Sequence, residues 1–191
     1  MAKEFGLLAS RYVMRAALIA VGAFAGTMVA SAQNALVPEP SSTFLNARTA
    51  FNNAWDESDL VFMVATFTNG ISAGYGDYTP RTTTEFTGSD ALSVYAEPIG
   101  YGFAETADGY QYKLTASYKL LNTSGQVLAE QGNFAQFTGT GRSKQRELSA
   151  SLTFQFSGLP AGKYQLETLF VDETSGKQSG FALPFTVSTS N

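Results

Sequence analysis

The stretch that decides the fold is Gly158–Lys177, GLPAGKYQLETLFVDETSGK, which has the pattern of a turn, a strand and a second turn. Pro160 and Gly162 stand at the second and fourth positions of the first turn, as a type I turn prefers. One face of the following strand carries Tyr164, Leu166, Thr168 and Phe170. A second alternating run comes after the DETSGK turn, with Phe181, Leu183, Phe185 and Val187 on one face. Only turn residues separate the two runs, so they predict a β-hairpin, with Pro184 at an edge or a bulge because proline donates no ladder hydrogen bond.

The same period of two continues on the N-terminal side of this hairpin. Apolar residues alternate with polar ones in ELSASLTFQFS (147–157), ALSVYAE (91–97) and YQYKLTASYKLL (110–121). LVFMVATFT (60–68) is dense in β-branched and aromatic residues, which predicts a strand buried on both faces. Together these runs predict an all-β fold, an immunoglobulin-like antiparallel β-sandwich of seven to eight strands over residues 59–191.

A different period precedes the strands. Apolar residues recur at spacings of three and four, which is typical of one face of a helix: Phe44, Ala47, Phe51, Ala54 and Trp55. We predict a short amphipathic helix over residues 42–56, capped by Ser41 or Ser42. The helix is expected to follow an extended lead-in, within residues 33–58, and to pack against the sandwich and bury Trp55.

The first 32 residues have the organisation of an export signal. Lys3, Arg11 and Arg15 make the beginning basic, and the uncharged run 16–32 ends in Ala-Ser-Ala. This pattern predicts a Sec-type signal peptide, cleaved after Ala32, and therefore a periplasmic or secreted protein. The alternative is an uncleaved membrane anchor, although the run is at the lower length limit for a spanning helix.

The composition of the remaining chain excludes several classes of function. Removing residues 1–32 lowers the Lys and Arg count from 12 to nine and the Asp and Glu count from 16 to fifteen, so the net charge falls from −4 to −6. Such an acidic chain is not expected to bind nucleic acid or anionic lipid. The sequence has no cysteine and no histidine, which removes disulfides, histidine-dependent catalysis and most zinc sites. We expect no cofactor, no metal and no membrane insertion after signal cleavage.

Tyrosines and glycines alternate between residues 70 and 112, and this is the candidate binding region. Rigid aromatic side chains on loops offer contact area at a low entropy cost. The tentative binding residues are Tyr75, Tyr78, Tyr101, Phe103 and Glu97, and we expect the first three, all in glycine-rich sequence, to be exposed. The other interpretation is that these rings pack at the rim of the sandwich. Tyr112 and Tyr118 follow the strand alternation and are predicted to lie in the core.

Carboxylates are the only catalytic groups left in quantity. Glu97 is the best single candidate, because we expect the proline after it to end a strand there. A second acid at a suitable separation would be needed for glycoside hydrolysis, and no spacing in the sequence specifies one. We therefore expect no enzyme activity and no catalytic residues.

The segment GRSKQREL places three basic residues two apart: Arg142, Lys144 and Arg146. If the segment is extended, these side chains share one side. We interpret them as the solvated face of an edge strand, where charge discourages aggregation. The alternative is contact with an anionic partner.

Several of these motifs resemble a known group of proteins. The set GYGDYTPR, SDALSVYAEPIGYGF and GLPAGKYQL, which spans roughly residues 74–187, is similar to an uncharacterised family of exported Gram-negative bacterial proteins with an immunoglobulin-like β-sandwich. The resemblance implies a periplasmic sandwich and carries no catalytic residue.

The functional prediction is a non-catalytic periplasmic or exported interaction module. It would bind an unknown protein or peptide of the cell envelope through the Tyr/Gly-rich rim. A carbohydrate-recognition module that uses the same tyrosines is the alternative, and a small carboxylate-dependent hydrolase is a distant third.

Overall fold

The structure is a computed structural model that describes residues 37–189, and these contain one helix and nine strands. The elements are α1 (Ser42–Glu57), β1 (Val61–Thr68), β2 (Glu85–Thr87), β3 (Leu92–Ile99), β4 (Ala104–Thr106), β5 (Gly109–Asn122), β6 (Val127–Gly141), β7 (Ala150–Phe154), β8 (Gly162–Asp172) and β9 (Gln178–Ser188). From Pro40 onward the helix and the strands belong to one compact unit. The proposed signal peptide and its cleavage after Ala32 lie outside the described residues.

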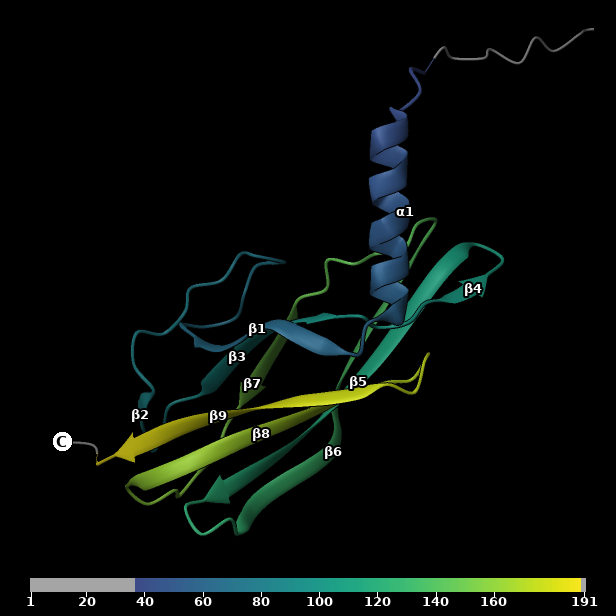
Figure 1. Cartoon of the computed structure of the whole chain (residues 1–191). Helices are drawn as coiled ribbons and strands as arrows, with labels where there is room; N and C mark the ends of the chain where they lie inside the picture. The colour runs from purple at the N-terminus through teal and green to yellow at the C-terminus, as the bar shows by residue number, and fades with distance from the viewer. Residues whose placement is uncertain (1–36, 190–191) are drawn as a thin grey trace, which may run out of the picture. The chain divides into compact units, whose positions relative to one another are not determined.

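The strands form two sheets, which Figure 1 shows one above the other. The smaller sheet has the order β1-β3-β7 and is antiparallel throughout. The larger sheet has the order β2-β9-β8-β5-β4, with β6 paired to β5. Its pairs are antiparallel except for the short β2, which runs parallel to β9. The prediction of a mainly β protein with one helix is confirmed, and the hairpin read from Gly158–Lys177 is β8–β9.

Aromatic side chains of the two sheets meet in the core. Phe62 of β1 lies 5.1 Å from Phe170 of β8, measured between ring centroids, and Tyr118 of β5 lies 5.1 Å from Phe154 of β7. The alternating positions of β7 and β8 supply fully buried residues, as the period of two predicts. Each edge-to-face pair of this kind adds about 0.5–1.5 kcal/mol beyond the area that it buries.

The turn between β8 and β9 is organised by the buried carboxylate of Asp172. Its Oδ2 accepts hydrogen bonds from Gly102 N (2.6 Å) and from the Ser175 hydroxyl, and its Oδ1 accepts one from Thr174 N (2.9 Å). Asp172 has no exposed surface, so these donors replace the water that a carboxylate otherwise requires. The closing turn is thereby tied to the loop between β3 and β4.

Lys177, in the same turn, ties the hairpin to the end of α1. Its ammonium donates to the carbonyl oxygens of Ser58 (2.6 Å), Gly100 (2.9 Å) and Asp56 (3.4 Å). The last carbonyls of a helix have no partner within the helix and carry partial negative charge, so a cation placed there stabilises the helix end.

Two expectations about individual strands have different outcomes. The segment 60–68 is not buried on both faces: Met63 is 67% exposed, because the pairing of β1 with β3 shifts between Phe62 and Val64 and turns Met63 outward at a sheet edge. Pro184 does lie at an open edge. β2 covers the outer side of β9 only from Thr186 onward, so the missing N–H of Pro184 costs no ladder bond.

The long strand β6 is interrupted by a bulge. Ala135 pairs with Ala116 and Gln131 with Tyr118, so the three residues Gly132–Phe134 stand opposite Ser117 alone. Asn133 has a φ of 50°, and its N–H donates to the Ser117 hydroxyl at 3.1 Å. The bulge therefore bends this edge strand at its middle.

Asp172→Ala is expected to lower the free energy of unfolding by about 3 kcal/mol, because it empties a fully buried site and leaves the half-buried N–H donors of Gly102 and Thr174 without their acceptor. Urea denaturation followed by circular dichroism measures the loss. Asp108→Ala, at an exposed turn position, is the control and should change stability by less than about 0.5 kcal/mol. An Asp172→Ala loss as small as that of the control would contradict the assigned role.

Candidate binding site

Helix α1 is joined to the sheets through its last turn. Ser41 caps its N-terminus by accepting a hydrogen bond from Phe44 N at 3.2 Å. At the other end Trp55 is only 7% exposed, its indole N–H donates to the carbonyl oxygen of Tyr101 (2.8 Å), and its ring meets the Tyr101 ring edge-to-face at 5.1 Å. The predicted helix, its cap and the burial of Trp55 are confirmed.

The rest of the helix stripe does not pack as expected. Phe44 is 57% exposed and Phe51 is 53% exposed, although both lie on the same face as Trp55. Trp55 is the one buried residue of α1, because the sheets and loops enclose only the end of the helix, as Figure 1 shows. An apolar helical period predicts a covered face, but it does not specify what covers it.

Tyr101 was expected to be exposed, and this expectation is wrong: the residue has no exposed surface. Its hydroxyl donates to the carbonyl oxygen of Gln145 at 2.7 Å, and burial raises its pKa. Gly100, with a φ of 77°, explains the difference, since a Cβ there would lie 2.2 Å from the carbonyl oxygen of Asp59. The glycine lets the backbone approach closely and turns Tyr101 inward, where its sequence context had suggested a loose loop.

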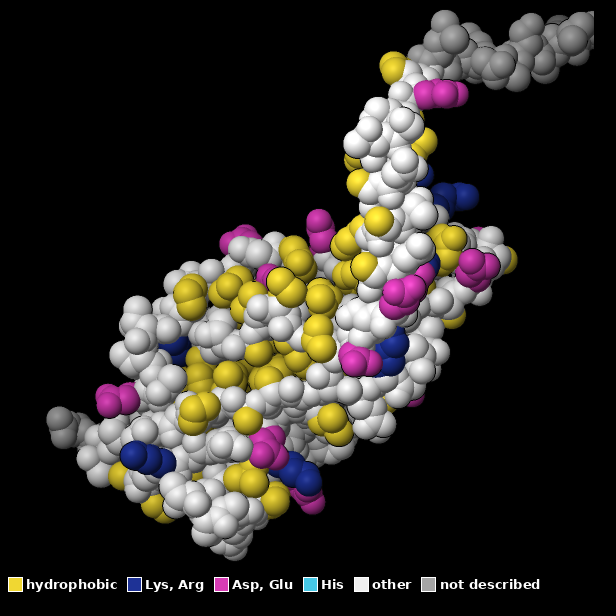
Figure 2. Space-filling view, viewed as in Figure 1, with side chains coloured by type: hydrophobic (Ala, Val, Ile, Leu, Met, Phe, Trp, Pro, Cys, Tyr) yellow, Lys and Arg dark blue, Asp and Glu magenta, His cyan; other side chains and the backbone are white. Residues whose placement is uncertain are grey.

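A hollow of about 830 Å³ lies beside the end of α1, and we call it the α1 hollow. Figure 2 shows hydrophobic side chains gathered beside the base of α1 and over β1, with others along the helix. Most of the lining is apolar or aromatic. The lining residues are Phe51, Trp55, Met63, Tyr75, Ile99, Tyr112 and the segment from Lys144 to Glu147.

The basic segment 142–149 forms one wall of this hollow and is not the edge strand that its spacing suggested. It carries no regular structure after β6 ends at Gly141. The Lys144 ammonium forms an ion pair with Asp56 at 3.1 Å. The Arg146 guanidinium instead lies among aromatic rings, 5.2 Å from the centre of Phe51 and 5.3 Å from that of Trp55. Both cations are therefore held against the end of α1, and both are only partly exposed.

Besides the buried Tyr101, which contacts Trp55 and Gln145, two predicted binding residues lie next to this arrangement, Tyr75 and Phe103. Tyr75 is 42% exposed, as expected, and lines the hollow. Partial burial raises its pKa, as do the negative charges of Glu97 and Glu147. Phe103 is half-buried beneath the basic segment, with the Arg146 guanidinium 5.9 Å from its ring centre.

Tyr78 and Glu97 belong to a neighbouring cluster on the outer face of β3. Tyr78 is half-buried and stacks on Tyr95, with ring centroids 4.0 Å apart. The Tyr95 hydroxyl donates to Glu97 Oε1 (2.6 Å) and accepts from Gly76 N (2.7 Å). The loop that contains Gly76 and Tyr78 therefore covers Tyr95, which has no exposed surface.

Glu97 does not end a strand, which corrects its expected position. Pairing between β3 and β1 continues through Pro98 and Ile99, opposite Phe62 and Val61. Glu97 consequently lies inside the sheet and is only 8% exposed. Proline is tolerated beyond it because the pairing is irregular at this point.

The aromatic groups that surround Arg146 could not be assembled from the sequence. Phe51 and Trp55 come from the helix, Phe103 from the loop before β4, and Arg146 from a segment more than forty positions further along. The helical stripe, the Tyr/Gly-rich region that contains Phe103 and the basic spacing were the signals, and each was assigned to a different surface. Tyr112 was predicted to lie in the core, and it is only 8% exposed, which confirms the prediction. It also lines the α1 hollow.

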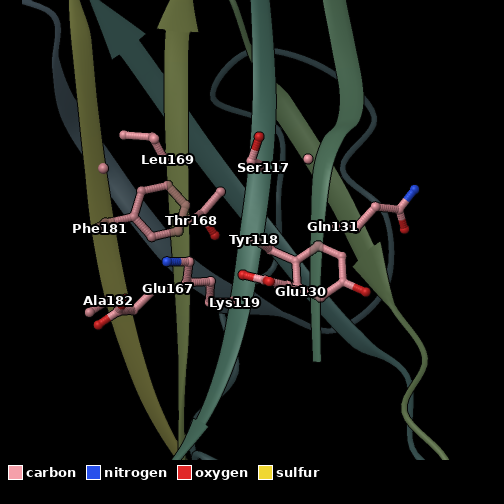
Figure 3. A pocket seen from close by; sticks show the side chains of 12 residues that line it. Ser117, Tyr118, Lys119, Glu130, Gln131, Glu167, Thr168, Leu169, Phe181 and Ala182 are labelled. Atoms are coloured by element: carbon pink, nitrogen blue, oxygen red, sulfur yellow. The ribbon is translucent and has the colours of Figure 1, made fainter. Parts of the chain in front are cut away.

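A second hollow, of about 570 Å³, lies on the larger sheet and contains none of the predicted site residues. Figure 3 shows its side chains arising from four neighbouring strands, β5, β6, β8 and β9. Lys119 stands opposite Glu130 on one side and Glu167 on the other. Charges of both signs in adjacent positions are typical of a solvated sheet face.

Comparison with known proteins gives no information about the function of this chain. No protein-family model and no curated protein matches the chain. Over residues 37–189 no helix has the length and apolarity needed to span a membrane. The same residues contain no group of three or more acidic side chains placed to hold a metal ion.

The Tyr95 cluster predicts a loss of stability at alkaline pH. Burial, and secondarily the hydrogen bond to Glu97, raise the pKa of Tyr95 to about 12 from an ordinary value of 10.0, so the folded state favours the neutral phenol. The stability that the folded protein gains from the neutral phenol is fully present below pH 10 and is lost as the pH rises through about 12. Urea denaturation at stepwise increasing pH should therefore show a flatter decline in Tyr95→Phe than in the unaltered protein. Tyr110→Phe is the control and should decline with pH as the unaltered protein does. If Tyr95→Phe also declines in that way, Tyr95 is not the group responsible for the loss of stability.

Proposed function

We propose that the chain is a non-catalytic interaction module that binds a protein partner of the cell envelope. The observation that carries this proposal is the group of exposed apolar side chains on α1 and in the α1 hollow. We define this α1 surface as Phe44, Phe51, Met63 and Tyr75, which are between 42% and 67% exposed. Single exposed apolar residues are ordinary, whereas several of them on and beside a concave site are typical of a binding surface.

Export to the periplasm or beyond is part of the proposal. The basic start, the apolar run and the Ala-Ser-Ala end of residues 1–32 support it. An immunoglobulin-like arrangement is likewise proposed, supported by the two packed sheets and the resemblance of the turn motifs to exported sandwiches. Under this proposal α1 precedes the sandwich in the sequence of the exported protein, and it serves as a docking element.

The low exposure of two of the three candidate tyrosines favours a protein ligand over a carbohydrate. Stacking on a sugar ring needs an open aromatic face, and a platform needs more than one. Tyr101 is buried and one face of Tyr78 is covered by Tyr95, so Tyr75 is the exposed member of the three. The hydrolase alternative loses its best candidate in a similar way, because Glu97 is buried and bonded to the Tyr95 hydroxyl.

Affinity capture from an envelope extract of the producing organism tests this function. Phe44→Asp/Met63→Asp places charges on the α1 surface at two exposed positions and should abolish recovery of the partner without unfolding the domain. The matched control is Ile71→Asp/Leu128→Asp, at exposed apolar positions elsewhere, which should leave recovery unchanged. If both double variants recover the same proteins as the unaltered chain, the α1 surface is not the binding surface.

A further inference from the structure

We propose that the α1 hollow binds the C-terminal residue of the partner polypeptide, with Arg146 pairing its carboxylate and the surrounding rings contacting its apolar side chain. This inference rests on the proposed function and specifies which part of the partner the site recognises.

The first observation is an unpaired cation in an enclosed position. Nε and Nη2 of Arg146 are buried and donate to no acceptor among the described residues. Three rings surround the guanidinium, those of Phe51, Trp55 and Phe103. Aromatic faces attract a cation but leave its N–H donors unsatisfied, and arginine cannot lose its charge to avoid that cost.

The second observation is that the nearby carboxylates do not pair with Arg146. Asp56 forms its ion pair with Lys144, and Glu97 accepts the hydroxyl of Tyr95. Glu147 also lines the hollow, but it is exposed and forms no ion pair with Arg146. Within residues 37–189 the guanidinium thus has no anionic partner, and one supplied by a ligand would meet the unsatisfied donors.

The two free nitrogens specify the kind of anion. Nε–H and Nη2–H lie along one edge of the planar guanidinium and point in the same direction, which matches the two oxygens of a carboxylate. The hollow around them is lined mostly by aromatic and aliphatic side chains, with Lys144, Gln145 and Glu147 beside Arg146, and has the volume of a site for a small ligand. A polypeptide whose last residue is apolar carries that side chain on the carbon that bears the carboxylate, so it supplies both features close together.

Access to Arg146 is controlled by Phe51. Trp55 is almost fully buried and Phe103 is half-buried, whereas Phe51 is 53% exposed and comes from the turn of α1 that precedes the packed end. Displacing the Phe51 ring therefore disturbs little of the core and opens a path for the carboxylate to the Nε–H and Nη2–H edge of the guanidinium. The ring then becomes available to the ligand's apolar side chain.

The test uses the protein purified from cells that express the full chain, with Trp55, the only tryptophan, as the fluorescent reporter. The probes are N-acetyl-leucyl-phenylalanine with a free carboxylate and the same dipeptide as its amide. We expect the acid to change Trp55 fluorescence and to bind about 10-fold or more tightly than the amide. Arg146→Lys should reduce this preference and Arg146→Gln should abolish it, because a lysine keeps the charge without the fork of donors and a glutamine has neither. Arg142→Gln, an exposed position in the same segment, should retain it.

Equal binding of acid and amide would overturn the carboxylate assignment while leaving an apolar ligand, and hence the proposed function, intact. Failure of both probes to bind would also overturn it, and the capture experiment would then judge the proposed function separately. The comparison of acid with amide uses the unaltered protein, so it decides the question even if the Arg146 variants do not fold.

Discussion

Contact between aromatic rings across the two sheets is the interaction on which this structure depends. The chain has no cysteine, so no covalent link restricts its unfolded state and apolar burial must hold the domain. Phe62 with Phe170, and Tyr118 with Phe154, join the smaller sheet to the larger one at separate places along the interface. The loops at the end of the sandwich can therefore be irregular, because the strands from which they emerge are already positioned.

Polar ties then connect this framework to α1. Asp172 binds the loop that contains Gly102, Lys177 binds the end of the helix, and Tyr101 links Trp55 to the segment of Gln145. All of these ties depend on buried groups finding partners, so each fixes the position of two segments that are distant in sequence. The α1 hollow is the space that they leave between the helix end, β1 and the basic segment. Its geometry is a consequence of the β8–β9 hairpin as much as of the residues that line it.

The parts of the fold that could be predicted from sequence are those with a local cause. A period of two identifies β5, β7, β8 and β9, and a period near 3.6 identifies α1, because burial on one face acts over neighbouring residues. Strands of three residues, such as β2 and β4, are too short to show a period. Tyr101 was misplaced because glycine permits both an open loop and a close approach, and only the surrounding backbone distinguishes them. The environment of Arg146 has no local cause at all, since its rings come from separate elements.

The bulge in β6 interrupts a long open edge of the larger sheet. β6 is a fifteen-residue strand at the edge of its sheet, and Glu130 is its one charged residue. A straight, nearly neutral edge of that length would present unpaired backbone groups to the same edge of a second molecule. The left-handed residue Asn133 divides it into two shorter runs that point in different directions. An interrupted edge is a poorer template for a second strand than a straight one, and a bulge is one of the ways in which proteins protect open sheet edges.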